Sequence, residues 1–207
     1  MNEKIIEKVM DSIHRQGLVE IEVSARHVHL SIGDLKTLFG NIELEEVRPL
    51  SQPGQFLSKQ KVNIIGPKRS IERVSVLGPV RSQTQVEISK SDAIQLGVDA
   101  PLRESGDLKG SAGITIVGPC GKIELKEGVI IAQNHIHVTE PDSKLLDLHD
   151  KDIVSVKVLS ERPVTFENVV IRVSKNFSCK MHVDFDEANA AFISGFTLGK
   201  IIKKDKN

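Results

Sequence analysis

Two copies of a His-x-His motif are the part of this chain best suited to chemistry. "SARHVHLS" carries His27 and His29, and "AQNHIHVT" carries His135 and His137, so the two copies hold four of the seven histidines. Residues two apart in a strand point to the same face, roughly 7 Å apart, and such a pair can share one metal ion. Imidazole suits zinc best, although cobalt, nickel and iron bind similarly.

An internal repeat nominates a third ligand for each pair. Residues 23–38 align with residues 131–146 at an offset of 108, the difference between 135 and 27. A second match, at an offset of 95 (the difference between 182 and 87), places Glu87 on His182. Two sites follow, one His/His/Glu and one His/His/His. Three protein ligands with an open fourth position are typical of catalytic zinc.

Other readings of the polar residues must be weighed beside this one. A single His-x-His on a strand is more often a surface or hydrogen-bonded pair, but two copies with matching third residues favour metal. Arg81 lies six residues before Glu87 and shares its strand face if no bulge intervenes. Spacing alone leaves two roles for Arg81. It is either a surface or ion-paired arginine, or it binds a phosphate or carboxylate through two hydrogen bonds. His14 and His149, outside the repeat, are expected to be solvated.

The elements that position these residues are expected to be short strands, each followed by a short helix. Four times a strand ends in a polar residue, then comes one spacer, a helix N-cap and an acid three residues later. Such a cap and acid satisfy the first N–H groups of a helix and suit its dipole. The four sets are His29–Ser31–Asp34, Glu87–Ser89–Asp92, His137–Thr139–Asp142 and His182–Asp184–Glu187.

The fold class follows from alternating apolar and polar residues punctuated by Gly-Pro turns. We predict a mainly β protein with two similar β-barrel halves capped by short helices. The halves are placed at residues 18–108 and 109–207, with a boundary near the Gly-rich "ESGDLKGSAG" and exchange of segments between them allowed. Residues 1–17 predict a short amphipathic helix, which either packs on the protein or docks to a larger assembly.

Composition excludes several classes of function. Lys+Arg and Asp+Glu number 28 each and there is no Trp or Tyr, so a nucleic-acid partner is not expected. No apolar stretch is long enough to span a membrane, and the first residues do not read as a secretory signal. Two cysteines without CxxC spacing indicate a reducing compartment, so we expect a cytoplasmic protein.

Several motifs together also resemble a known family. "SARHVHLS", "LSQPGQF", "LGPVRSQTQVEIS", "APLRESGDLKG", "GVIIAQNHIHVT" and "MHVDFDEANA" are similar, in order and spacing, to the PduL-type phosphotransacylases, or phosphate propanoyltransferases. The resemblance runs from about residue 19 to residue 192. It implies two β-barrel halves with two zinc ions at their junction, and exchange of coenzyme A and phosphate on a short acyl group.

The resemblance also assigns roles to residues. It gives Arg81 the phosphate, and it gives coenzyme A contacts to Ser24, Arg48, Leu77 and Asn189. One zinc would be held by His27, His29 and Glu87, the other by His135, His137 and His182. Where the family often has "GVSNRH" this chain has "EVSARH", which puts details of the coenzyme A contacts in doubt.

The sequence therefore predicts a zinc-dependent phosphate acyltransferase, with two Zn²⁺ per chain. It would interconvert propanoyl-CoA or acetyl-CoA plus phosphate with acyl phosphate plus coenzyme A. No Ser/His/Asp or Cys/His triad is visible, so direct attack by phosphate is expected. The alternatives are a two-metal thioesterase or phosphoesterase and a non-catalytic microcompartment assembly protein. In some family members a short N-terminal amphipathic helix directs the enzyme into the lumen of a bacterial microcompartment, and residues 1–17 resemble such a helix. The sequence therefore allows shell or cargo proteins as partners, and it also allows a homo-oligomer.

Overall fold

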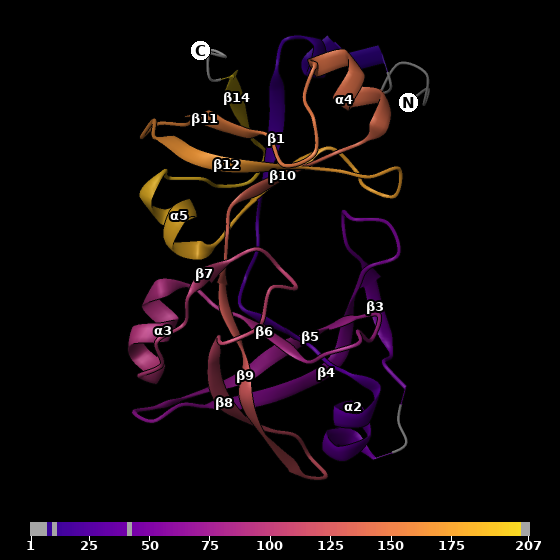
Figure 1. The fold of residues 1–207 in the computed structure, drawn as a ribbon, viewed down its shortest axis with the longest axis vertical. Helices are drawn as coiled ribbons and strands as arrows, with labels where there is room; N and C mark the ends of the chain where they lie inside the picture. The colour runs from indigo at the N-terminus through magenta and orange to yellow at the C-terminus, as the bar shows by residue number, and fades with distance from the viewer. Residues whose placement is uncertain (1–7, 10–11, 41–42, 204–207) are drawn as a thin grey trace. The chain divides into compact units, whose positions relative to one another are not determined.

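The structure, a computed structural model, describes residues 8–9, 12–40 and 43–203. The chain divides into two compact units, which we name by their place in the sequence. The middle unit is residues 25–133, and the terminal unit is residues 1–24 and 134–207. Each unit has its own hydrophobic core. Figure 1 shows the strands and helices of both units.

The terminal unit is a closed barrel whose first and last strands come from opposite ends of the chain. Indigo β1 pairs antiparallel with yellow β14 (Figure 1). Helices α4 (Glu140–Leu146) and α5 (Phe185–Ala190) follow β10 and β13. Around the barrel the strands run β1 (Leu18–Val23), β13 (Lys180–Val183), β10 (His135–Val138), β12 (Thr165–Val173), β11 (Ile153–Leu159) and β14 (Thr197–Lys203).

The strand pairings of the middle unit also close a six-membered ring. In order the ring runs β4 (Phe56–Ile65), β5 (Ser70–Gly78), β2 (His27–His29), β6 (Gln85–Glu87), β9 (Lys122–Ala132) and β8 (Ala112–Val117), which pairs with β4 again. Two short strands, β3 (Glu46–Pro49) and β7 (Leu102–Arg103), pair with β4 and β9. Helices α2 (Ile32–Phe39) and α3 (Lys90–Leu96) follow β2 and β6.

The two rings have the same topology, so the predicted class of two similar β-barrels with short helices is confirmed. In each ring the His-x-His strand lies between one parallel and one antiparallel neighbour. The units are not continuous halves of the chain, however. Strand β1 precedes β2 in sequence but pairs in the terminal unit, and β9 precedes β10 but pairs in the middle unit. The compact units divide after residues 24 and 133, whereas the predicted halves meet at 108/109 with exchange of segments allowed.

All four predicted helix caps are present. In each, the cap side chain accepts a hydrogen bond from the backbone N–H three residues later, which fixes where the strand ends and the helix begins. In α3 and α5 the acid also accepts from the cap's own N–H, completing a capping box. The capping residues are Ser31, Ser89, Thr139 and Asp184.

The residue before each His-x-His motif reaches the acid of one of these caps. In the middle unit Arg26 holds Asp92 with two contacts of 2.8 Å, so its role there is structural. In the terminal unit the corresponding residue is Asn134, whose amide donates to Glu187 at 2.7 Å. An amide supplies no counter-charge. Burial therefore raises the pKa of Glu187 to about 7.

This difference predicts a pH dependence of stability. The pKa of Glu187 in the unfolded chain is close to 4.5. The protonated side chain therefore contributes fully to the free energy of unfolding below pH 4.5, and this contribution is lost as pH rises through about 7. Between pH 5 and 8 the free energy of unfolding of the wild type should fall by at most about 3 kcal/mol because of this group. We expect this fall to be absent in Glu187→Gln. Urea unfolding of both proteins across that range checks it, and parallel pH profiles would contradict it.

Two glycines make a matched pair for testing backbone packing. A Cβ on Gly66, in the turn after β4, would lie 2.3 Å from the carbonyl oxygen of Leu96 at the end of α3. A Cβ on Gly33, inside α2, would meet only Ser31 Oγ at 4.0 Å. We expect Gly66→Ala to destabilise by about 1–3 kcal/mol and Gly33→Ala to stabilise by about 0.5–1 kcal/mol. Urea unfolding midpoints measure both, and equal midpoints would contradict the packing.

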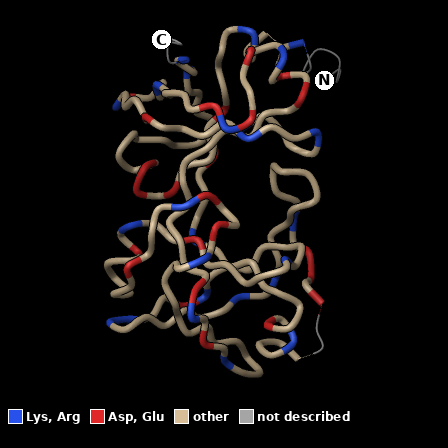
Figure 2. The backbone as a smooth tube through the Cα atoms, viewed as in Figure 1, with Lys and Arg blue, Asp and Glu red and all other residues tan. Residues whose placement is uncertain are grey.

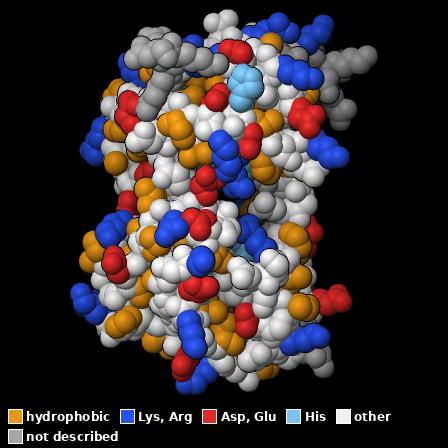
Figure 3. Space-filling model, in the orientation of Figure 1, with side chains coloured by type: hydrophobic (Ala, Val, Ile, Leu, Met, Phe, Trp, Pro, Cys, Tyr) orange, Lys and Arg blue, Asp and Glu red, His pale blue; other side chains and the backbone are white. Residues whose placement is uncertain are grey.

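Charged residues of both signs are spread over both units (Figure 2). Positive and negative residues alternate along both units and mix on the visible surface (Figures 2 and 3). Among the described residues, none of the helices has the length and hydropathy needed to cross a bilayer. Residues 8–9 and 12–15 are helical, while 1–7 and 10–11 of the predicted N-terminal helix lie outside the described residues.

Candidate active site

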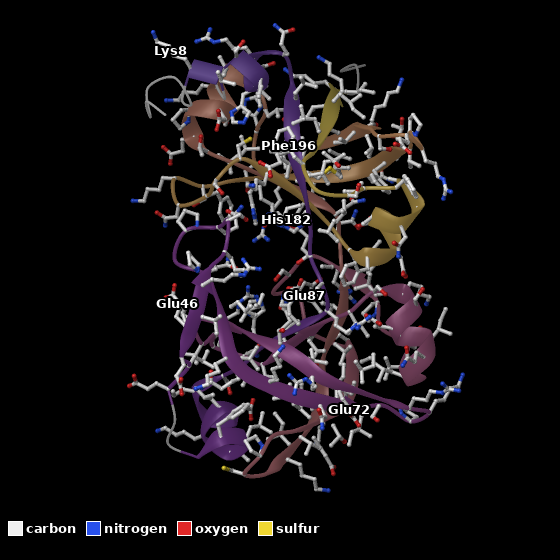
Figure 4. All side chains as sticks on the ribbon, turned by 180° about the vertical axis from the view of Figure 1, so that it is seen from behind. Lys8, Glu46, Glu72, Glu87, His182 and Phe196 are labelled. Atoms are coloured by element: carbon white, nitrogen blue, oxygen red, sulfur yellow. The ribbon has the colours of Figure 1, made fainter. Side chains whose placement is uncertain are left out.

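The middle unit brings the predicted ligands His27, His29 and Glu87 together. His27 lies directly opposite Glu87 across the β2–β6 pair, as the repeat predicted. Nε2 of His27 is 3.5 Å from Oε2 of Glu87, and potential ligand atoms of all three residues lie within 4.8 Å of one another. Figure 4 shows Glu87 among the strands of this unit.

The surroundings of this group favour a cation. Nδ1 of His27 is 2.8 Å from the Ala25 carbonyl oxygen, which leaves Nε2 toward Glu87. Nδ1 of His29 is buried and has no hydrogen-bond partner within the described part of the chain. A neutral imidazole nitrogen without a partner beside an ionised carboxylate is what a divalent metal needs. The donor set therefore fits zinc.

Electrostatics support the same arrangement. Burial, reinforced by the positive charges of His27 and Arg81, lowers the pKa of His29 to about 3, so this imidazole is neutral at pH 7. Burial alone would lower the pKa of His27, but the Glu87 carboxylate raises it overall. Burial opposes ionisation of Glu87, yet His27 brings its pKa well below the ordinary value. The His27–Glu87 ion pair, with Nε2 and Oε2 3.5 Å apart, thus lies where a cation would bind.

Glu87 is held by two side chains that sequence reasoning missed. The Ser105 hydroxyl donates to Oε1 of Glu87 at 2.9 Å, and the Gln85 amide donates to the same oxygen. Gln85 is fixed in turn by the Gly106 N–H, 2.8 Å from its Oε1. Ser105 lies in the Gly-rich segment predicted as the boundary between halves. That segment instead belongs to the middle unit and supports the carboxylate.

Arg81 reaches the same network, though not along a strand face. Strand β6 begins at Gln85, so Arg81 stands before it, in a bridge to Ser31. Nη1 of Arg81 donates to Ser105 Oγ at 3.1 Å, which links the guanidinium through one hydroxyl to Glu87. The shared strand face required an unbroken strand from Arg81 to Glu87, and β6 begins only at Gln85, so Ser105 provides the link between the two residues instead.

A pocket of about 330 Å³ opens beside this group. Its only charged lining residue is Arg81, and one imidazole, His29, lies in the wall. Gly78 is required there, because a Cβ on it would overlap the Phe56 ring at 2.1 Å. The remaining lining residues are Pro53, Gly54, Gln55 and Pro79. The "SQPGQF" segment, predicted only as a turn, therefore forms one wall.

The terminal unit gathers His135, His137 and His182 less tightly. His135 lies opposite His182 across β10–β13, again as the repeat predicted, and the three ring centroids are 4.7–5.3 Å apart. Figure 4 labels His182 within this unit. The rings of His135 and His182 are stacked, with centroids 5.3 Å apart and an interplanar angle of 22°. This trio is not among the groups whose ligand atoms all lie within 4.8 Å.

Two further residues surround this second group. The ring of Phe177 packs on His137 with centroids 4.0 Å apart. Oε2 of Glu22 lies 3.7 Å from Nδ1 of His182, across the β1–β13 pair. A carboxylate beside a ligating imidazole is a common second contact in zinc sites, since it fixes the ring tautomer. The donor set suits zinc, but the ligand atoms are less closely gathered than those of the middle unit.

The four residues assigned to coenzyme A lie in both units. Leu77 is half-buried in β5, and Arg48 is exposed on β3. Ser24 follows β1, where its N–H donates to the Val183 carbonyl, and Asn189 is exposed in α5.

One of the two histidines expected to be solvated is buried instead. His14 is buried beside Asp142 and not solvated, whereas His149 is exposed as expected.

Comparison with known proteins identifies the family. A family model described as phosphate propanoyltransferase matches residues 20–194. A phosphate propanoyltransferase of Clostridioides difficile is 48% identical over 97% of this chain and 97% of its own length. One from Listeria monocytogenes is 44% identical over 100% and 99%, and one from Priestia megaterium is 50% identical over 92% and 88%. This chain therefore belongs to the phosphate propanoyltransferase family and is an acyltransferase.

Proposed function

We propose that the protein transfers a short acyl group, propanoyl or acetyl, between coenzyme A and inorganic phosphate. One observation carries this proposal: the pocket that holds Arg81 lies against the His27/His29/Glu87 group. An anion site next to a cation site suits phosphate as nucleophile and a polarised thioester as acceptor. The names of the relatives support the same reaction.

Arg81 is proposed to hold the phosphate. A guanidinium presents N–H donors in a fixed fork that matches a phosphate in two contacts, which lysine does not reproduce. Ser105 holds one arm of the fork at 3.1 Å, so the side chain is oriented before phosphate binds. Fixing the nucleophile in this way replaces a chance collision with a set geometry.

The metal ligands are proposed to be His27, His29 and Glu87 for one zinc. A second zinc would be held by His135, His137 and His182. When bound, zinc supplies Lewis-acid stabilisation of the oxyanion or thiolate that develops during transfer. The protein's own part is to keep Glu87 ionised and His29 neutral, which their pKa shifts already achieve.

Direct transfer needs no acyl-enzyme. Phosphate is anionic at pH 7, so its oxygen attacks the thioester carbonyl without a strong base. The C–S bond breaks, coenzyme A leaves as thiolate, and acyl phosphate is the product. Among the described residues that line the pocket, none carries a hydroxyl or thiol that could take the acyl group. We propose that Ser24, Arg48, Leu77 and Asn189 contact coenzyme A, with the exposed Arg48 facing its phosphates.

Location and assembly extend the proposal. Residues 1–17 would direct the enzyme from the cytoplasm into a microcompartment lumen, with shell or cargo proteins or a second copy of the chain as partners. A fusion of residues 1–17 to a fluorescent protein tests this. Diffuse fluorescence in cells that form microcompartments would contradict it.

Ser105 provides a prediction of moderate size. Ser105→Ala removes the hydroxyl that both supports Glu87 and holds Arg81. Loss of such a supporting contact typically costs about 10- to 100-fold in metal affinity. Competition with a zinc-binding dye measures this, and Ser111→Ala, in the same unit but bonded to Leu108 and Gly128, is the control. Equal zinc affinity in Ser105→Ala and the wild type would contradict the role.

The competing activity is hydrolysis, with water as the nucleophile in place of phosphate. Thiol release from propanoyl- and acetyl-coenzyme A, with and without phosphate, separates the two. We expect release that requires phosphate and yields acyl phosphate in equal amount. Release at the same rate without phosphate would make the protein a thioesterase.

A further inference from the structure

The terminal unit holds a group of metal-ligating side chains separate from the His-x-His motifs. It consists of His14 in the helical segment 12–15, Asp142 in the first turn of α4, and Cys179 just before β13. Potential ligand atoms of the three lie within 4.8 Å of one another. Three separate segments of the chain therefore converge on one point.

The two carboxylate oxygens of Asp142 have different partners. Oδ2 accepts from the Thr139 hydroxyl at 2.7 Å, as part of the helix cap. Oδ1 lies 2.9 Å from Nδ1 of His14. Capping therefore accounts for one oxygen only, and the other faces the histidine.

Burial distinguishes this group from an ordinary surface ion pair. His14 is 7% exposed and Cys179 is 8% exposed. Nε2 of His14 has no hydrogen-bond partner among the described residues. A buried polar atom without a partner is unfavourable, so the hydrogen bond between Nδ1 and Asp142 does not by itself explain the burial of this histidine.

The donor types define the ligand. A thiolate and an imidazole select borderline metals such as zinc, cobalt and nickel and disfavour magnesium and calcium. Zinc bond lengths of roughly 2.0–2.3 Å place its ligand atoms roughly 3–4 Å apart, which small side-chain rotations reach from the present arrangement. We propose that His14, Asp142 and Cys179 bind one zinc-class divalent ion. The ion fastens the N-terminal helical segment to α4 and to the start of β13.

This site faces away from His182, the predicted zinc ligand on the same segment. Side chains alternate along β13, so Cys179 shares a face with buried Met181 and Val183, while His182 points to the other. Thr139, the N-cap of α4, follows His137 by two residues. Its hydroxyl donates to Oδ2 of Asp142, whereas His14 contacts the other oxygen, Oδ1. The proposed ion is therefore structural and does not require the acyltransfer proposal to be correct.

Cobalt provides the test, because cobalt–thiolate bonds give a charge-transfer absorption that imidazole and carboxylate ligands do not. The probe is Co²⁺ alone, added to the full-length metal-free protein. We expect the charge-transfer band in the wild type and its loss in Cys179→Ser. In His14→Ala the cobalt affinity, measured by titration of this band, should be at least about tenfold weaker. The matched controls Cys120→Ser and His149→Ala, both exposed, should keep the band.

A second measurement needs no variant. Alkylation of the unmodified chain, followed by mass spectrometry of its two cysteine peptides, should show Co²⁺ slowing Cys179 at least about tenfold and leaving Cys120 unchanged. A missing charge-transfer band, a band that persists in Cys179→Ser, or equal alkylation with and without Co²⁺ would overturn the proposal. None of these outcomes depends on acyltransfer activity.

Discussion

Arg81→Lys is expected to lower kcat/KM for phosphate at least about 100-fold, and Arg81→Ala about 1000-fold or more. A lysine keeps the charge but loses the two-contact fork, and alanine loses both. The loss should appear mainly in the phosphate dependence, because the acyl-coenzyme A contacts are proposed for other residues. Steady-state kinetics with phosphate as the varied substrate measure it.

Arg103→Lys is the matched control for this substitution. Arg103 lies in the same unit and pairs with Asp107 at 2.8 Å, but it does not line the pocket. Its kinetics should stay within about twofold of the wild type. If Arg81→Lys also stayed within twofold, with the fold intact by circular dichroism, Arg81 would not be the phosphate ligand.

Glu87→Gln is expected to give the largest loss of metal. The amide has nearly the same shape but no charge. Its oxygen can keep the contacts that Ser105 and Gln85 make with Oε1, which leaves its NH₂ group facing His27 in place of the carboxylate oxygen Oε2. Without the carboxylate, the pKa of His27 should fall from its raised value, since burial then acts alone. We expect zinc affinity at this site to fall at least about 100-fold, with acyltransfer lost in proportion.

Glu72→Gln serves as the control for Glu87→Gln. Glu72 is exposed on β5 of the same unit, and both residues are labelled in Figure 4. Metal content after dialysis, measured by mass spectrometry, should drop by one ion per chain in Glu87→Gln and not change in Glu72→Gln. Equal metal content in the two variants would remove Glu87 from the ligand set.

Local and repeated features of the fold could be predicted from the sequence. The four helix caps depend on side chains three residues apart, and the structure contains all of them. The pairing of His27 with Glu87 and of His135 with His182 followed from the repeat, because equivalent strands adopt the same register in both rings. The repeat carried this long-range information within a single sequence.

Other features depend on contacts that no local pattern encodes. Ser105 stood in a Gly-rich segment and was assigned to a boundary, although its hydroxyl joins Arg81 to Glu87. His14 lay in a polar stretch and was expected to be solvated, but it is buried beside Asp142, 128 residues away. The division of the chain was hidden for the same reason, since β1 and β9 pair outside the half in which each was predicted.

The measurement that tests the central claim most directly is acyl phosphate formation by metal-free protein before and after zinc is returned. The chain would be stripped with a chelator, shown to remain folded, and supplied with propanoyl-coenzyme A and phosphate. We predict no transfer by the metal-free protein and recovery of the full rate as zinc is added, with Glu87→Gln failing to recover. Undiminished phosphate-dependent transfer by the metal-free protein would contradict the account.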